Sequence, residues 1–219
     1  MKFVELQELF QEKLGIDHLA VNTSDLDKQH ELLKKTDYEC NFREIIPNSP
    51  FKKNLLNKYT TFHELAYYES LVEDYFPIEL TSHGGQAYKN ETPISFKGKT
   101  INLKVTDIDK EKLLWTKILD SPISNNIIKF SSLLPKRGFN LQFTKVRSQE
   151  PYTLDFEGPT CIALITKNIQ ILFNQLQTLG INSLYGPWKA TINHKKMHIG
   201  MFRTYNNIIV ELIQLEKSK

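Results

Sequence analysis

Residues 16–25 read IDHLAVNTSD, and this stretch decides the fold class. Residues 16–21 are typical of a short strand, because they combine Ile, Leu and Val in one run. Ser24 or Asp25 can then cap a helix, since either side chain accepts a hydrogen bond from the first helical turn. The predicted helix carries an apolar stripe made of Leu26, Leu32 and Leu33. A strand that leads directly into a helix is therefore the unit to look for elsewhere in the chain.

The same unit occurs twice more. Residues 100–105 (TINLKV) precede a helix capped by Asp107, and residues 160–165 (TCIALI) precede a helix capped by Asn168. More than one strand candidate follows each helix, at residues 62–68 and 77–81, 127–133 and 139–146, and 197–204 and 208–215. Such closely spaced strands are typical of antiparallel hairpins. The predicted fold class is therefore α+β, although the alternation alone would also fit a parallel α/β sheet.

The predicted organisation is a leading helix followed by three modules. The helix covers residues 1–15 and ends at Gly15, and the modules cover residues 16–85, 99–146 and 159–216. A polar stretch around Pro47 and Pro50 is interpreted as a long loop inside the first module. Turns are predicted at residues 135–138, at Gly186-Pro187 and at Asn206-Asn207.

Composition excludes several classes of protein. The chain has 219 residues, of which 40% are hydrophobic and 24% charged, as in an ordinary globular protein. A net charge of +3 is too small to indicate a nucleic-acid or membrane partner, and two cysteines do not form a disulfide framework. The first residues lack the unbroken apolar run of a signal peptide, and no stretch has the length of a membrane helix. We therefore expect a cytoplasmic protein.

Ionisable side chains occur inside three of the predicted strands. His18 lies in the first strand, Glu79 lies in PIELT (residues 77–81) and Glu211 lies in IVELI (residues 209–213). Because side chains alternate between the faces of a strand, each lies on the face opposite its apolar neighbours. A carboxylate on a concave, partly dry face needs a partner, and a divalent metal meets that need. Imidazole and carboxylate ligands suit zinc, iron, manganese, nickel or cobalt.

These motifs resemble the vicinal oxygen chelate superfamily, which includes glyoxalase I, fosfomycin-resistance proteins and extradiol dioxygenases. The similarity rests on the opening HLAVNTSD (residues 18–25) and on the two closing strands with Glu79 and Glu211, and it covers about residues 16–215. It implies βαβββ modules whose mixed sheets form a cup for a small molecule, with helices on the outer face. In this family, the opening-strand residue and the closing-strand glutamate bind one divalent metal ion.

The family pattern places the metal ligands in the first and third modules. The ligand positions there are His18 and Glu79, and Cys161 and Glu211. The resemblance implies that His18, Glu79 and Glu211 bind the metal, with Cys161 or water completing the site. This requires the first and third modules to share a cup, within one chain or across a dimer.

The second module departs from the family pattern. Its two ligand positions hold Asn102 and Gln142, which are poor metal ligands. If the second and third modules pair instead, their cup contains these two residues with Cys161 and Glu211, and we expect no metal there. Three modules leave one unpaired in either case, which favours a homodimer.

Each candidate also has an ordinary structural explanation. His18 can bind a nearby backbone group, both glutamates can face solvent, and Cys161 can be a small buried apolar residue. The residues proposed to line the substrate pocket are His83, Tyr67, Trp188 and Phe202, and core packing is the alternative for the aromatic ones.

The resemblance implies a metal-dependent lyase or isomerase of the glyoxalase or epimerase type. It would act on a small hydroxy- or keto-carbonyl compound, with Glu79 or Glu211 as the general base. An extradiol dioxygenase is a weaker alternative, because that site resembles two histidines with one carboxylate and only His18 is clearly placed. A metal-free protein that sequesters a drug, as bleomycin-resistance proteins do, is the alternative of a different class. A tailoring enzyme without metal is a third.

Overall fold

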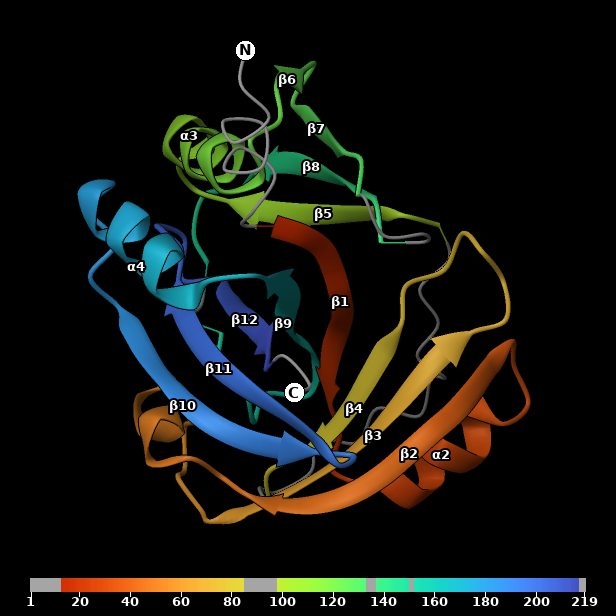
Figure 1. Ribbon diagram of the computed structural model, residues 1–219. Helices are drawn as coiled ribbons and strands as arrows, with labels where there is room; N and C mark the ends of the chain where they lie inside the picture. Colours follow the sequence, from red (N-terminus) through yellow and green to blue (C-terminus); the bar gives the residue numbers. More distant parts are fainter. Residues whose placement is uncertain (1–12, 85–97, 133–136, 150–151, 217–219) are drawn as a thin grey trace, which may run out of the picture.

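The computed structural model describes residues 13–84, 98–132, 137–149 and 152–216. The described residues form two sheets (Figure 1). The larger sheet has eight strands in the order β10-β11-β12-β9-β1-β4-β3-β2 and curls into a half-barrel, and the smaller has the order β5-β8-β7-β6. The concave face of the larger sheet is called the cup below. The predicted α+β class with cupped mixed sheets is confirmed.

Each of the three predicted modules contains one strand, one helix and three further strands. The first comprises β1 (Lys13–Asn22), α2 (Leu26–Leu33), β2 (Tyr38–Pro47), the 3₁₀ helix η1 (Pro50–Asn54), β3 (Phe62–Ser70) and β4 (Ile78–Ser82). The second comprises β5 (Thr100–Val105), α3 (Ile108–Leu119), β6 (Ile123–Ser124), β7 (Ile127–Phe130) and β8 (Phe139–Lys145). The third comprises β9 (Gly158–Thr166), α4 (Ile169–Thr178), β10 (Leu184–Ile192), β11 (Lys195–Arg203) and β12 (Ile209–Leu215).

The three helices begin at the capping residues that the sequence indicates. The side chain of Asp25 accepts a hydrogen bond from the backbone of Lys28, and Asn168 accepts one from Ile171. Asp107 caps α3 in the same way. Because each cap satisfies a backbone donor of the first turn, each helix starts at a fixed distance from the strand before it.

The first and third modules pair within one chain. Strand β1 runs antiparallel to β9, with His18 opposite Ala163 and Ala20 opposite Cys161. Strand β4 then lies parallel to β1, and β12 lies parallel to β9. The alternative in which the second and third modules form the common sheet is therefore wrong. The homodimer stays a prediction.

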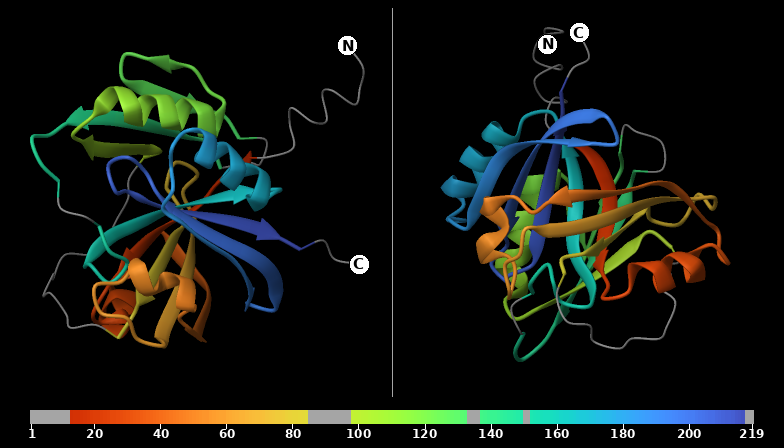
Figure 2. Two further views of the ribbon diagram at one scale, coloured as in Figure 1. Left: turned by 90° about the vertical axis from the view of Figure 1, so that its left-hand side faces the viewer. Right: turned by 90° about the horizontal axis from the view of Figure 1, so that it is seen from below.

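The second module covers the outer face of the larger sheet. Its helix α3 lies near α4 (Figures 1 and 2), and its buried Trp115 shares one apolar cluster with Leu19 and Ile162 of the larger sheet. A polar contact joins the same parts, because Asn206 donates from Nδ2 to Oε2 of buried Glu111 at 2.7 Å. The second module therefore braces the strands that form the cup from behind.

Three local predictions need correction. The stretch before Pro47, interpreted as a loop, is strand β2, in which exposed and half-buried residues alternate after Tyr38. Gly186-Pro187, predicted as a turn, lies inside β10, where the register shifts between Tyr185 and Trp188. Of the predicted leading helix, residues 1–12 lie outside the described residues, and Lys13 to Gly15 belong to β1. In the first two cases the tertiary pairing of strands overrides the local turn signals.

Within the described part of the chain, no helix combines the length and the apolar character that crossing a membrane would require.

Candidate metal centre

Three ionisable side chains from three strands meet on the floor of the cup. His18 comes from β1, Glu79 from β4 and Glu211 from β12. The strand registers bring them together, because Ala20 lies beside Glu79 and Ala163 lies beside Glu211. Two pairs of parallel strands, joined by the antiparallel β1 and β9, therefore place all three residues on one face.

The geometry of this group suits a cation. The Nε2 atom of His18 lies 3.7 Å from Oε1 of Glu79 and 3.8 Å from Oε2 of Glu211. One ligand atom from each residue lies within 4.8 Å of the others. The Nε2 atom of His18 is buried and has no hydrogen-bond partner among the described residues. A buried polar atom without a partner is costly, and a cation between the three side chains would remove that cost.

The charges within the group also favour a bound cation. Burial acts to lower the pKa of His18, but the Glu79 carboxylate and Asp17 outweigh it and raise this pKa to about 9. Burial and then the charge of Glu79 raise the pKa of Glu211 to about 7. Two carboxylates at one buried position cannot both be charged cheaply without a cation. The residues present therefore fit a divalent metal ion.

Neighbouring side chains fix the orientation of the His18 imidazole. Its Nδ1 atom lies 2.9 Å from Oδ2 of Asp17, and the ring of Tyr67 packs edge-on against it at a centroid distance of 5.8 Å. Arg137, which precedes β8 of the second module, bonds the backbone carbonyl of Asp17 and lies 2.9 Å from Oε1 of Glu69. A carboxylate on one ring nitrogen directs the other nitrogen toward a metal, as in many metal sites.

Cys161 does not belong to the group. Ligand atoms of the group lie within 4.8 Å of one another, and Cys161 is not among them. Its side chain packs with Ala20, Leu55 and Met201 in an apolar cluster. Burial raises the pKa of its thiol well above the usual range, so the thiolate that binds metals is disfavoured. The interpretation as a small buried apolar residue fits better than a role as the fourth ligand.

The cup contains a hollow of about 510 Å³ next to the group. Glu79 and Glu211 form part of its wall, together with Lys52, His63 and Trp188. A smaller hollow of about 200 Å³ lies on the other side of the group. The larger hollow is big enough to hold a small organic molecule.

The four residues proposed to line the pocket differ in where the structure places them. Trp188 lines the larger hollow and Tyr67 the smaller one. His83 is buried, and its Nδ1 lies 3.0 Å from Oδ1 of Asn48, so it supports the wall. Phe202 is fully buried in the apolar cluster of the outer face, because it alternates with Met201 along β11. The prediction that Phe202 lines the substrate pocket is therefore wrong.

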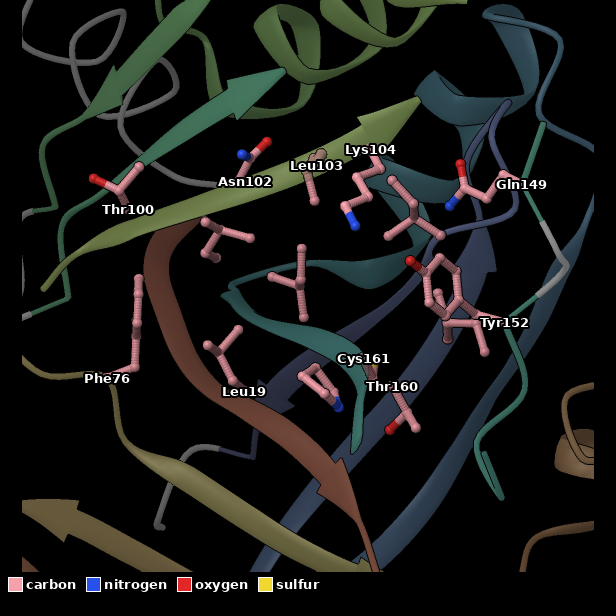
Figure 3. Close-up of a pocket in the computed structure, with 15 residues that line it drawn as sticks. Leu19, Phe76, Thr100, Asn102, Leu103, Lys104, Gln149, Tyr152, Thr160 and Cys161 are labelled. Carbon is pink, nitrogen blue, oxygen red and sulfur yellow. The ribbon is translucent and has the colours of Figure 1, made fainter. Parts of the chain in front are cut away.

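Another hollow, of about 340 Å³, lies behind the sheet, between β5 and the outer face of β1 and β9 (Figure 3). Leu19 and Phe76 form apolar walls, and the side chains of Lys104, Gln149 and Tyr152 point into it (Figure 3). Among the described residues, its lining contains no carboxylate and no imidazole. The residues that could hold a metal therefore lie in the cup.

Three site residues were not predicted from the sequence: Asp17, Lys52 and Arg137. Asp17 adjoins His18 in the chain, and this adjacency is the one sequence signal that could have indicated it. The other two reach the site through tertiary packing. His63 lies in a predicted strand, from which it could face the cup, and it lines the hollow.

The fold and the group together define a cupped small-molecule site that can hold a divalent cation. No family model matches the sequence, and no curated protein sequence is similar to it. The solved structures that resemble the chain include a glyoxalase I, a methylmalonyl-CoA epimerase and integron cassette proteins.

Three of these structures illustrate the similarity in sequence and in fold. Methylmalonyl-CoA epimerase from Mycobacterium tuberculosis is 12% identical with a TM-score of 0.45, covering 94% of this chain and 91% of that one. Glyoxalase I from Zea mays is 15% identical with a TM-score of 0.37, covering 93% and 69%. An integron cassette protein from the mobile metagenome of the Halifax Harbour sewage outfall is 15% identical with a TM-score of 0.40, covering 53% and 96%. Likenesses at this level say nothing about activity or ligands.

Proposed function

We propose that the protein is a metal-dependent lyase or isomerase of the glyoxalase or epimerase type, acting on a small hydroxy- or keto-carbonyl compound. The observation that carries the proposal is the convergence of His18, Glu79 and Glu211 on one buried point, with Nε2 of His18 unpartnered among the described residues. A zinc, iron, manganese, nickel or cobalt ion held there would act as a Lewis acid toward two neighbouring substrate oxygens.

The side chains around the site supply proton transfer. Glu79 and Glu211 both line the hollow beside the metal site. Either carboxylate, once displaced from the metal, would take a proton from a carbon next to a carbonyl and return it.

The walls of the cup keep water away from the reacting atoms. Leu65, Ile199 and Ile192 are buried in one apolar cluster of the cup, against which Trp188 packs. In such surroundings the interaction between a charged side chain and a developing negative charge is stronger than in water. Apolar walls therefore favour a reaction that passes through an enolate-like or alkoxide-like state.

Dioxygenase chemistry is less well supported. The usual iron site for that reaction has two histidines and one carboxylate. The group found among the described residues has one histidine and two carboxylates.

Sequestration of an organic molecule without chemistry is the second candidate. The large hollow with Trp188 in its wall favours it, because a flat apolar ligand could fill that space without any metal. The two candidates differ in their response to chelation. Removal of a resident cation lowers the stability and activity of the enzyme, whereas a sequestration protein is indifferent to chelator.

Elemental analysis of protein purified without chelators or affinity metals tests the first candidate. We expect about one divalent cation per chain in the native protein and a loss of most of it in His18→Ala and Glu79→Ala. The control is Glu39→Ala, which removes an exposed glutamate of β2 and should keep the metal. Equal metal in all four proteins would contradict the proposal. Exchange of the C2 proton of 2-hydroxy acids and of the C3 protons of 2-oxo acids for deuterium, followed by NMR, then tests the reaction class.

A further inference from the structure

Lys52 is a buried cation that faces the cup. It lies in η1 and its side chain is only 7% exposed. Its Nζ atom makes no hydrogen bond or ion pair with any described residue, and it lies 5.9 Å from the centroid of the Trp188 ring. Pro50 at the start of η1 and the stacking of Phe51 on Trp188, at 6.0 Å, fix the segment that carries it. A lysine in this position is therefore held in the wall and is not a mobile surface group.

An ammonium group in such a position is most stable beside an anion, because a negative partner and hydrogen bonds replace the hydration that the group loses in the wall. The charge of Lys52 lowers the pKa of Glu211, but no carboxylate oxygen of a described residue lies within 4.0 Å of Nζ. The folded chain thus places a positive charge in the wall of the hollow without a carboxylate partner among the described residues. A bound ligand can supply that negative partner.

His63 offers hydrogen-bonding capacity beside it. The residue is 2% exposed, and neither ring nitrogen has a partner among the described residues. Burial, and then the charge of Lys52, lower its pKa well below the usual range, so the ring is neutral. A neutral imidazole has one N–H donor and one acceptor. His63 can therefore donate one hydrogen bond without adding a second charge.

The neighbouring His83 explains why His63 is held in this orientation. The two rings stack with centroids 4.4 Å apart and an interplanar angle of 18°. Nδ1 of His83 lies 3.0 Å from Oδ1 of Asn48, and Nδ2 of Asn48 donates to the backbone carbonyls of Thr60 and Phe62. Asn48 therefore fixes His83, and His83 fixes His63.

These groups lie in the same hollow as the metal-binding group. Lys52, His63, Glu79 and Glu211 all line the space of about 510 Å³. We propose, on the basis of the proposed function, that the substrate is a small organic acid. Its carboxylate binds Lys52 and His63, and its reactive carbon lies over Glu79 and Glu211. The subsite thus selects acids over neutral carbonyl compounds.

Charge balance favours a carboxylate over a phosphate. Lys52 supplies one positive charge, and His63 is neutral. A phosphate monoester carries close to two negative charges at neutral pH and prefers several cationic donors.

Calorimetric titration of the native protein tests the inference with 2-oxobutyrate, methyl 2-oxobutyrate and hydroxyacetone phosphate as probes. We expect the acid to bind at least tenfold more tightly than its neutral ester. Lys52→Met should remove this preference, while Lys53→Met, which changes the exposed neighbour, should keep it. His63→Phe should weaken acid binding with little effect on the ester. Tighter binding of hydroxyacetone phosphate, which has no carboxylate, than of 2-oxobutyrate would overturn the choice of a carboxylate.

The two proposals fail in different measurements. Equal binding of acid and ester by the native protein, no binding of the acid, or an unchanged preference in Lys52→Met would overturn the subsite. The metal content of each variant is measured on the same samples. Native protein without a cation that still prefers the acid would contradict the metal-dependent function and leave the subsite standing.

Discussion

Arg137 and Asp17 come from different modules, yet the guanidinium Nη1 of Arg137 lies 3.9 Å from Oδ1 of Asp17. Asp17 in turn holds Nδ1 of His18. Burial acts to raise the pKa of Asp17, but the hydrogen bond and charge of His18 and the charge of Arg137 keep it lowered. The second module, which has no metal ligands of its own, therefore helps to orient the imidazole in the cup of the other two.

Asp17→Asn should weaken metal binding by about 10- to 100-fold, the usual effect of removing a carboxylate that orients a histidine ligand. The amide keeps the shape of the side chain but loses its charge. Competition of the protein with a chelating dye for zinc measures the affinity. Asp27→Asn, at an exposed residue of α2, should leave the affinity unchanged. An unchanged affinity in Asp17→Asn would show that Asp17 has no orienting role.

Cys161→Ala should keep the full metal content. The thiol lies outside the group formed by His18, Glu79 and Glu211, and it packs in an apolar cluster. Loss of its small buried side chain should lower the free energy of unfolding by about 1 kcal/mol. Elemental analysis and urea denaturation of the same preparation separate the two effects. A loss of metal from the folded variant would make Cys161 a ligand after all.

The contact between Glu111 and Asn206 should be important for stability. Glu111 is fully buried, and Trp115 donates from Nε1 to its Oε1 at 2.9 Å while Asn206 donates to its other oxygen. Asn206→Leu would leave this carboxylate short of donors, and we expect a loss of about 3 kcal/mol in the free energy of unfolding. Urea denaturation measures it. Asn207→Ser, at the exposed neighbour with a φ of 58°, serves as the control for the loop.

The buried His63 and His83 should make the protein sensitive to acid. Burial and the charge of Lys52 lower the pKa of His83 to about 3, and the pKa of His63 is lowered as well. Below about pH 6.5 each ring binds a proton in the unfolded chain but not in the folded one, so each lowers the free energy of unfolding as the pH falls; above that pH this effect is absent.

His63→Phe removes one of these protons. Between pH 6 and 4, the free energy of unfolding of the variant should fall less steeply than that of the native protein, by about 1.4 kcal/mol per pH unit. Urea denaturation across this range measures both slopes. His194→Asn, in the exposed turn between β10 and β11, should keep the native slope. Identical slopes in the native protein and His63→Phe would mean that His63 is protonated in the folded state.

The sequence predicts the local elements better than their pairing. The caps at Asp25, Asp107 and Asn168 depend on neighbouring residues, and such signals can be identified without tertiary structure. The pairing of β1 with β9 depends on residues about 140 positions apart, and the sequence left two pairings open. Strand β2 was missed because its polar and proline residues resemble those of a loop.

The same distinction holds for the site. His18, Glu79 and Glu211 belong to short strand motifs that recur in a family, and the structure places them together. Lys52 stands next to Lys53 in a polar stretch, and only its packing against Trp188 distinguishes the two. Arg137 reaches Asp17 across 120 residues of sequence, without a local motif.

Anomalous X-ray scattering from a crystal of native protein, grown without chelator, tests the central claim most directly. The account predicts one peak above the metal absorption edge in the cup, about 2.0–2.2 Å from Nε2 of His18 and from one oxygen each of Glu79 and Glu211. Water or a hydrogen-bonded imidazolium at that position, with no anomalous peak in the cup, would contradict it.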